Sequence, residues 1–158
     1  MSVTLRPAQP RDLAFLLSLA PRLAEFGLPD WRTGVQVVEA ERRALARAVE
    51  TASPDAPIFI AEEGGSPAGF VYVEMQTDFF TGCPTAHVSI LAVTDAAQGH
   101  GIGAALLDAA EAWARARECS FVSLNVFPQN TRARNVYERL GYGLETLRYV
   151  KPLGGETS

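Results

Sequence analysis

The sequence contains only two cysteines and one lysine among its 158 residues, and these shortages exclude several classes of function. Cys83 and Cys119 belong to no CxxC pair and to no Cys/His cluster, so we expect neither a metal site nor a disulfide framework. The net charge of −4 argues against a nucleic-acid partner, because proteins that bind nucleic acid usually present a basic face. No apolar run approaches the roughly 18 residues of a membrane span, and the N-terminus shows no signal-peptide pattern. We therefore expect no membrane partner and a cytoplasmic location.

The composition is ordinary for one globular domain. Hydrophobic residues make up 47% of the chain and charged residues make up 20%. A chain of this length buries roughly 70% of the surface that its unfolded state exposes. We expect a single domain over residues 1–153, followed by a disordered tail over residues 154–158.

A glycine-rich loop, Gln98-Gly99-His100-Gly101-Ile102-Gly103, is the most informative stretch of the chain. The β-branched run 86–93 before it predicts a strand, and the run 104–118 after it, which begins with alanines and leucines, predicts a helix. The first N–H groups of a helix have no partners within the helix, and glycines leave room beside the backbone. Such a loop favours a diphosphate ligand, although a plain turn before a helix has the same composition.

Two common diphosphate-binding motifs do not match this loop. A P-loop needs Gly-Lys-Ser/Thr, and the only lysine of the chain is Lys151. The spacing GxGxxA in residues 99–104 fits a dinucleotide fingerprint, but that fingerprint needs an acidic residue about 20 positions further on. No Asp or Glu occurs between Glu118 and Glu138, so a dehydrogenase is a remote alternative.

Two other spacings resemble motifs of the GNAT N-acetyltransferase superfamily. The spacing Q-x-x-G-x-G in residues 98–103 is similar to the family's loop for the pyrophosphate of acyl-CoA. The spacing N-x-x-A-x-x-x-Y-x-x-x-G-Y in residues 130–142 is similar to the family's C-terminal motif. The two motifs occur in the family's order, with one expected strand between them. The resemblance extends over roughly residues 58–153.

The expected elements predict an α/β (α+β) fold. A strand–helix–strand crossover makes strands 86–93 and 121–127 parallel neighbours. The resemblance implies a mixed, mostly antiparallel sheet of about six to seven strands flanked by about four helices. It also implies that acyl-CoA lies in the splay between the two parallel central strands. The expected strands are 3–6, 58–62, 68–74, 86–93, 121–127 and 144–150, and the expected helices are 10–26 with a kink at Pro21, 35–51, 104–118 and 131–140.

The resemblance implies an acetyl-CoA-dependent N-acetyltransferase that uses no metal. Its acceptor would be a primary amine of a small molecule or a peptide, attacking directly in a ternary complex. A non-catalytic acyl-CoA-binding sensor or structural module on the same fold is the alternative, and a homodimer is common in the family. The residues that the resemblance assigns to acetyl-CoA binding are Leu91, Ala92 and Val93 through their main chain, then Gln98, Gly99, His100, Gly101, Ile102, Gly103 and Ala104 in the loop, and Asn130, Ala133 and Tyr137 in the C-terminal motif.

Three residues are catalytic candidates. Tyr137 matches the family's tyrosine that gives a proton to the leaving sulfur, although a helical tyrosine is often a packing residue. Many members carry a carboxylate as general base on strand 86–93, at positions that correspond to His87 and Ser89 here. His87 titrates in the right range, and Glu74, on a strand expected to pair nearby, is the next candidate. A hydrogen-bonded core histidine and a solvent-facing carboxylate are the alternative interpretations.

Overall fold

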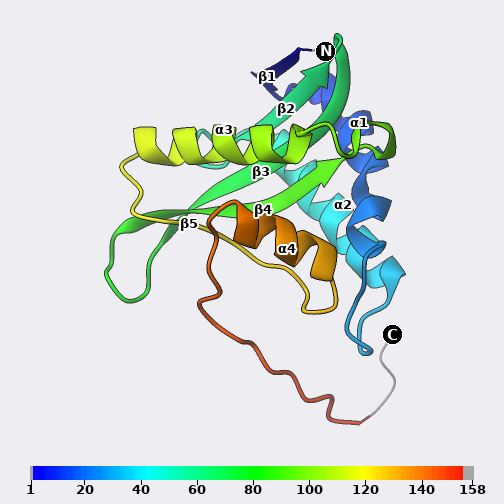
Figure 1. Cartoon of the computed structure of the whole chain (residues 1–158), viewed down its shortest axis with the longest axis vertical. Coiled ribbons are helices and arrows are strands. Elements are labelled where there is room, and N and C mark those ends of the chain that lie inside the picture. Colours follow the sequence, from blue (N-terminus) through cyan, green and yellow to red (C-terminus); the bar gives the residue numbers. More distant parts are fainter. Residues whose placement is uncertain (1, 155–158) are drawn as a thin grey trace.

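The computed structural model describes residues 2–154, which form one sheet with helices on both faces (Figure 1). The pairings from the first strand to the fourth are antiparallel, and the fifth strand joins the fourth in parallel. This is the predicted α/β (α+β) class, and it confirms that the strands predicted at 86–93 and 121–127 are parallel neighbours. Except for Gly154, the predicted tail lies outside the described residues. The sheet order is β1 (Val3–Pro7), β2 (Ile58–Glu63), β3 (Ser66–Thr77), β4 (Pro84–Val93) and β5 (Val122–Leu124).

The sheet separates two hydrophobic layers. One layer packs α1 (Leu13–Ser18) and α2 (Gly34–Thr51) on one face, around Leu16, Leu45 and Phe70. The other packs α3 (Ile102–Ala116) on the opposite face, and α4 (Thr131–Arg139) contributes Tyr137 to it (Figure 1). Among the described residues, no helix has the length and apolar character to cross a membrane. Each face of the sheet therefore has its own hydrophobic cluster.

The helix predicted over residues 10–26 is split into three pieces. A 3-10 turn at Pro10–Asp12 precedes α1, and a second at Ala20–Ala24 follows it. Pro21 lies at the start of the second turn, where its missing N–H prevents a continuous α-helix. Arg6 fixes the first turn to β1, because its guanidinium donates to both Asp12 carboxylate oxygens at 2.8 Å and holds the pKa of Asp12 at about 2.

The central hairpin forms as predicted. Gly64 and Gly65 adopt φ values of +60° and +82° between β2 and β3, a conformation that favours glycine. The two strands pair antiparallel with a register shift after Ala61.

Thr33 begins α2 with a capping box, in which its hydroxyl accepts from the Gln36 N–H at 3.1 Å.

The predicted count of six to seven strands is too high, since the sheet has five. The strand predicted over 121–127 is only three residues long, and the strand predicted over 144–150 does not form. The second segment leaves the body of the protein after α4 and runs alongside no other strand (Figure 1). A strand needs a neighbour to satisfy its backbone groups, so propensity alone did not determine this segment.

Candidate functional site

The glycine loop forms a cradle at the start of α3. Gly99 and Gly101 have φ values of +84° and +80°, and a Cβ on either would meet no atom within 4 Å. The first bond of the helix runs from the Ala105 N–H to the Gly101 carbonyl at 3.1 Å. The N–H groups of residues 102–104 precede that bond and lack helical partners. Open space, free donors and the positive end of the helix dipole fit a diphosphate group such as that of CoA.

The two polar side chains of the loop are held by the protein itself. The Gln98 amide oxygen accepts from Arg22 at 3.1 Å, and His100 Nδ1 lies 2.9 Å from a Glu63 carboxylate oxygen. The main-chain N–H of His100 donates to the Ala97 carbonyl at 3.1 Å, so it is not one of the free donors of the cradle. The cradle is therefore built from backbone rather than from side chains.

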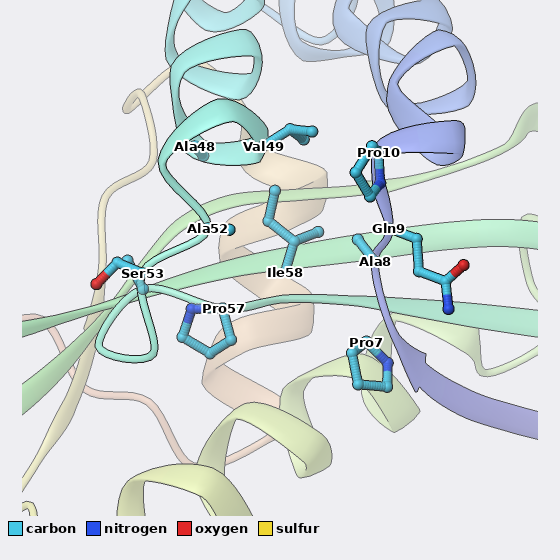
Figure 2. Close-up of a pocket in the computed structure, with 11 residues that line it drawn as sticks. Pro7, Ala8, Gln9, Pro10, Ala48, Val49, Ala52, Ser53, Pro57 and Ile58 are labelled. Atoms are coloured by element: carbon cyan, nitrogen blue, oxygen red, sulfur yellow. The ribbon is translucent and has the colours of Figure 1, made fainter.

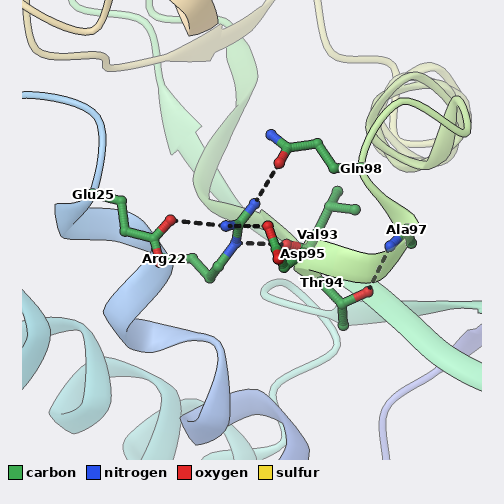
Figure 3. A network of polar contacts seen from close by, with 7 residues as sticks. All are labelled: Arg22, Glu25, Val93, Thr94, Asp95, Ala97 and Gln98. Carbon is green, nitrogen blue, oxygen red and sulfur yellow. Dashed lines mark hydrogen bonds and ion pairs between the residues drawn. The ribbon is translucent and has the colours of Figure 1, made fainter.

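Arg22 connects this loop to β4 and is a site residue that the sequence did not reveal (Figure 3). Its Nε donates to the Val93 carbonyl at 3.1 Å, and its other nitrogens reach Gln98, Glu25 and Asp95. Only 15% of its side chain is exposed. The contacts to Val93 and Gln98 span 71 and 76 positions of sequence, so no local pattern could indicate them.

A β-bulge at Ser89 determines which backbone groups of β4 are free. Val88 pairs with Val73 and Ile90 pairs with Tyr72, which leaves Ser89 as the extra residue. The Thr94 N–H donates to the carbonyl of Ala68 in β3, and N–H directions alternate along a strand. This alternation gives the directions of the N–H groups of residues 91–93.

The N–H groups of Leu91 and Val93 point away from β3, whereas that of Ala92 points toward it. The Arg22 bond supports this assignment, since the carbonyl of Val93 faces the same side as its N–H. β5 pairs only with residues 86–88 and ends at Leu124. Beyond the bulge, the donors of Leu91 and Val93 therefore face an unpaired side of β4.

A polar cluster lies at the bulge, on the face covered by α2. Glu74 pairs across the strands with His87, and the Ser89 hydroxyl donates to the Glu74 carboxylate. On the other side of β4, His87 Nδ1 lies 2.8 Å from the Ser123 hydroxyl. Burial lowers the pKa of His87, and the negative charge of Glu74 partly opposes this shift. The structure thus brings together His87 and Glu74, the two predicted base candidates, with two serines.

Glu74 opens into a cavity of about 310 Å³ between β3 and the C-terminal half of α2. Tyr72 borders the same cavity. Burial, followed by the charge of Glu74, raises the pKa of Tyr72 to about 12, so its hydroxyl stays protonated. The carboxylate is therefore both hydrogen-bonded and accessible from this face.

A second cavity of about 200 Å³ lies between the end of β1 and the end of α2 (Figure 2). Its lining contains no titratable side chain and none of the predicted site residues. Because this cavity has no reactive side chain in its lining, we assign it no chemical role. Its lining residues are Pro7, Ala8, Gln9, Pro10, Ala48, Val49, Ala52, Ser53, Ala56, Pro57 and Ile58.

The C-terminal motif forms α4 and places Tyr137 on the opposite face of the sheet from Glu74. The Asn130 side chain caps the helix by accepting from the Ala133 N–H at 3.1 Å. Tyr137 packs on the α3 side of the core with its ring edge against Tyr142, at 6.2 Å between centroids. Burial raises the pKa of Tyr137, and its hydroxyl has no hydrogen-bond partner among the described residues. By contrast, Tyr142 donates to Glu111 at 3.0 Å.

The described residues contain no group of three or more His, Cys, Asp and Glu side chains that could hold a metal ion. The candidate site has three parts. They are the backbone cradle at the start of α3, the free donors of Leu91 and Val93 on β4, and the polar cluster at the bulge.

A model of the acetyltransferase (GNAT) family matches residues 22–142. No curated protein matches the sequence. A GCN5-related N-acetyltransferase from Ralstonia eutropha JMP134 is similar in structure, with a TM-score of 0.76 at 20% identity over 98% of this chain and 100% of that one. An aminoglycoside N-acetyltransferase in complex with CoA has a TM-score of 0.72 at 19% identity, over 97% and 96%. A ribosomal-protein-alanine N-acetyltransferase from Brucella melitensis has a TM-score of 0.72 at 20% identity, over 97% and 100%.

Proposed function

The chain belongs to the acetyltransferase (GNAT) family, and we propose that it transfers an acetyl group from acetyl-CoA to a primary amine of a small molecule or a peptide. The observation that carries this proposal is the bulge at Ser89. It turns the N–H groups of Leu91 and Val93 toward the unpaired side of β4, and it brings Ser89 to Glu74. In this proposal, the bulge at Ser89 orients the N–H donors of Leu91 and Val93 toward a developing negative charge. The same bulge places Ser89 against Glu74, the proposed base.

The cradle at the start of α3 would hold the pyrophosphate of the co-substrate. The free N–H groups of residues 102–104 and the open space at Gly99 and Gly101 suit this group without any cationic side chain. Acetyl-CoA, when bound there, supplies the acetyl group as an activated thioester. Arg22 keeps the cradle and the end of β4 in a fixed relation through Gln98 and Val93.

The backbone N–H groups of Leu91 and Val93 are suited to stabilise the negative charge that develops on the thioester oxygen. They are fixed in a strand, so they need no reorganisation during the reaction. One preorganised donor of this kind contributes about 2.7–4 kcal/mol of transition-state stabilisation. The side chains of both residues pack against the α3 layer of the core, which leaves the role to the main chain.

The acceptor amine must lose a proton, and Glu74 is suited to take it. For a lysine-like amine, reaching the neutral form at pH 7 costs about 4–5 kcal/mol. The Glu74 carboxylate can attract the ammonium form first and accept its proton next, directly or through water. His87 is the adjacent alternative base, since its lowered pKa keeps the imidazole neutral and able to accept a proton.

Tyr137 is suited to give a proton to the departing sulfur. In the proposed reaction the amine nitrogen bonds to the carbonyl carbon and releases its extra proton to solvent. The carbon–sulfur bond breaks, and the sulfur accepts the Tyr137 proton. A phenol is a weaker acid than a thiol in water, and burial raises the pKa of Tyr137 further. Desolvation of the thiolate in the cleft raises the pKa of the thiol as well, which opposes this effect. The proton returns to Tyr137 from solvent.

The base and the acid lie on opposite faces of the sheet. Glu74 lies on the face of the sheet covered by α2, and Tyr137 packs against the α3 layer on the other face. With the thioester held between them beside β4, the amine arrives from the α2 face while the sulfur leaves toward α4. This arrangement supports a direct attack in which both substrates are bound together.

A thiol-release assay with acetyl-CoA tests the proposal against a panel of amino acids, polyamines, aminoglycosides and short peptides. Calorimetric titration of acetyl-CoA accompanies it. Thiol release with one amine class is the expected result and identifies the acceptor. Tight binding of acetyl-CoA without release for any amine would favour the non-catalytic acyl-CoA-binding module instead.

A further inference from the structure

The cavity beside Glu74 has one charge of each sign in its lining. Glu74 lies on β3, and Arg47 lies on α2, which covers this face of the sheet. Tyr72 lines the same wall as Glu74, because alternate residues of a strand share a face. Burial is the main cause of the raised pKa of Tyr72. The charge of Glu74 raises this pKa further and that of Arg47 opposes it, so both charges lie near the phenol.

Arg47 has no partner within the chain. Among residues 2–154, its guanidinium forms no ion pair and donates no hydrogen bond. By contrast, Arg6, Arg22 and Arg117 bind carboxylates at 2.8, 2.8 and 2.6 Å. An unpaired arginine on an open surface is common, but Arg47 borders a cavity that also holds a carboxylate. Its donors are therefore available to a ligand, and their planar fork matches a carboxylate through two parallel hydrogen bonds.

The cavity has the size of a site for a small molecule. Its volume of about 310 Å³ lies near the lower end of the range for such sites, roughly 300–1,000 Å³. Ala44, Ala48 and Ala56 contribute to its lining, and their short side chains keep the space between α2 and β3 open. This volume suits a ligand of about the size of an amino acid.

We propose that the acceptor amine also carries a carboxylate, so that Glu74 receives its ammonium group while Arg47 binds its carboxylate. The inference rests on the proposed function, in which Glu74 takes the proton of the amine. One positive and one negative group in the lining match a zwitterion of no net charge, such as an amino acid. Arg47 is then a residue that determines specificity.

Other classes of amine match these two charges less well. A polyamine or an aminoglycoside would bring a further ammonium group toward Arg47, and like charges repel. A phosphorylated amine would bring two negative charges, of which Arg47 neutralises one, into a cavity that already contains Glu74. A simple alkylamine would leave the donors of Arg47 unused. Only an aminocarboxylate uses both charged groups without a charge left over.

Calorimetric titration of matched pairs of ligands tests this inference without turnover. The pairs are lysine with cadaverine, phenylalanine with 2-phenylethylamine, and 4-aminobutanoate with propylamine, whose members differ only by the carboxylate. The titrations contain excess CoA, which has no acetyl group to transfer. The aminocarboxylate should bind about 10–100-fold more tightly than its partner in at least one pair. Absence of this preference in all three pairs, or absence of binding by all three aminocarboxylates, would overturn the proposal.

Substitutions of Arg47 connect the preference to this side chain. Arg47→Gln should lower the affinity for the preferred aminocarboxylate about 10–100-fold. Arg47→Glu should favour cadaverine over lysine, because a carboxylate then faces the second ammonium group. A reversed preference requires a folded protein, so it cannot result from damage to the fold.

Arg42→Gln is the matched control. It makes the same change at an exposed position of α2 that does not line the cavity, so it should retain the wild-type affinities. An unchanged affinity in Arg47→Gln, or an equal loss in Arg47→Gln and Arg42→Gln, would overturn the role of Arg47.

The failure of this inference can be told apart from the failure of the proposed function. Thiol release with some amine, without any preference for a carboxylate, would leave the acetyltransferase function in place and overturn only the role of Arg47. Binding of an aminocarboxylate that depends on Arg47, without thiol release for any amine, would support the recognition site and contradict the catalytic proposal.

Discussion

Glu74 and His87 face each other as a cross-strand pair between β3 and β4, beside the bulge at Ser89. Many members of the family carry a carboxylate base on this strand, at positions that correspond to His87 or Ser89 here. In this chain a carboxylate reaches the same place from the neighbouring strand, and the Ser89 hydroxyl binds it. We propose that Glu74 compensates for this departure from the pattern across the sheet.

Replacing Glu74 by Gln should lower kcat/KM for the amine by about 10²–10⁴, the usual contribution of a positioned base. The amide keeps the shape and can still accept from Ser89, so the stability should change little. Thiol-release kinetics measure the effect, with Glu50→Gln on the exposed side of α2 as control. Equal kinetics for the two variants would remove Glu74 from the mechanism.

Replacing Tyr137 by Phe should lower kcat by about 10²–10⁴ while leaving the affinity for acetyl-CoA unchanged. The Tyr137 hydroxyl has no partner among the described residues, so its loss should not destabilise the fold. Tyr142→Phe is the matched control: it removes a hydroxyl that binds Glu111 at 3.0 Å and should cost about 1 kcal/mol of stability without affecting kcat. An unchanged kcat in Tyr137→Phe would show that solvent protonates the sulfur.

Stability should depend on pH through His87. Burial lowers the pKa of His87 in the folded state below the ordinary value of 6.5, so the unfolded chain binds this proton at higher pH. The free energy of unfolding therefore falls as pH drops from 6.5 to the folded pKa, by at most about 1.4 kcal/mol per pH unit. Above 6.5 the contribution is fully present.

Denaturant titrations at several pH values measure this dependence for the wild type and for His87→Gln. The variant should show a flatter profile below pH 6.5, because the group with the lowered pKa is absent. Parallel profiles would mean that His87 does not cause the loss of stability in acid.

Replacing Arg22 by Met should raise KM for acetyl-CoA and lower the free energy of unfolding by about 1–3 kcal/mol. The change leaves the Val93 carbonyl and the Gln98 amide without their partner at the cradle. Arg32→Met, at an exposed position, is the control. A normal KM in Arg22→Met would separate this network from co-substrate binding.

Much of the fold was predictable because its signals are local. The glycine loop, the Gly64–Gly65 turn and the Asn130 cap act within a few residues, and the structure has all three where the sequence placed them. The parallel neighbours β4 and β5 followed from the handedness of crossovers.

The remaining features depend on partners distant in sequence. The bulge at Ser89 arises from a register between two strands, and the Arg22 network joins residues more than 70 positions apart. The strand predicted at 144–150 did not form, because the chain after Tyr142 leaves the sheet and this segment pairs with no strand. The residue types of 144–150 favour a strand, but strand formation also depends on the path of the chain relative to the sheet, which the sequence pattern does not give.

The most direct test of the account is calorimetric titration of acetyl-CoA into the wild type and into Gly103→Asp. A Cβ at Gly103 would meet only a Val93 methyl at 4.0 Å, so the fold can accept the side chain. Its carboxylate would stand in the cradle and repel a diphosphate. Gly34→Asp, which places the same change in the first turn of α2, is the control.

We expect binding in the wild type and in the control, and none in Gly103→Asp. Binding of equal strength in all three proteins, or no binding in any of them, would contradict the assignment of the glycine loop and the mechanism built on it.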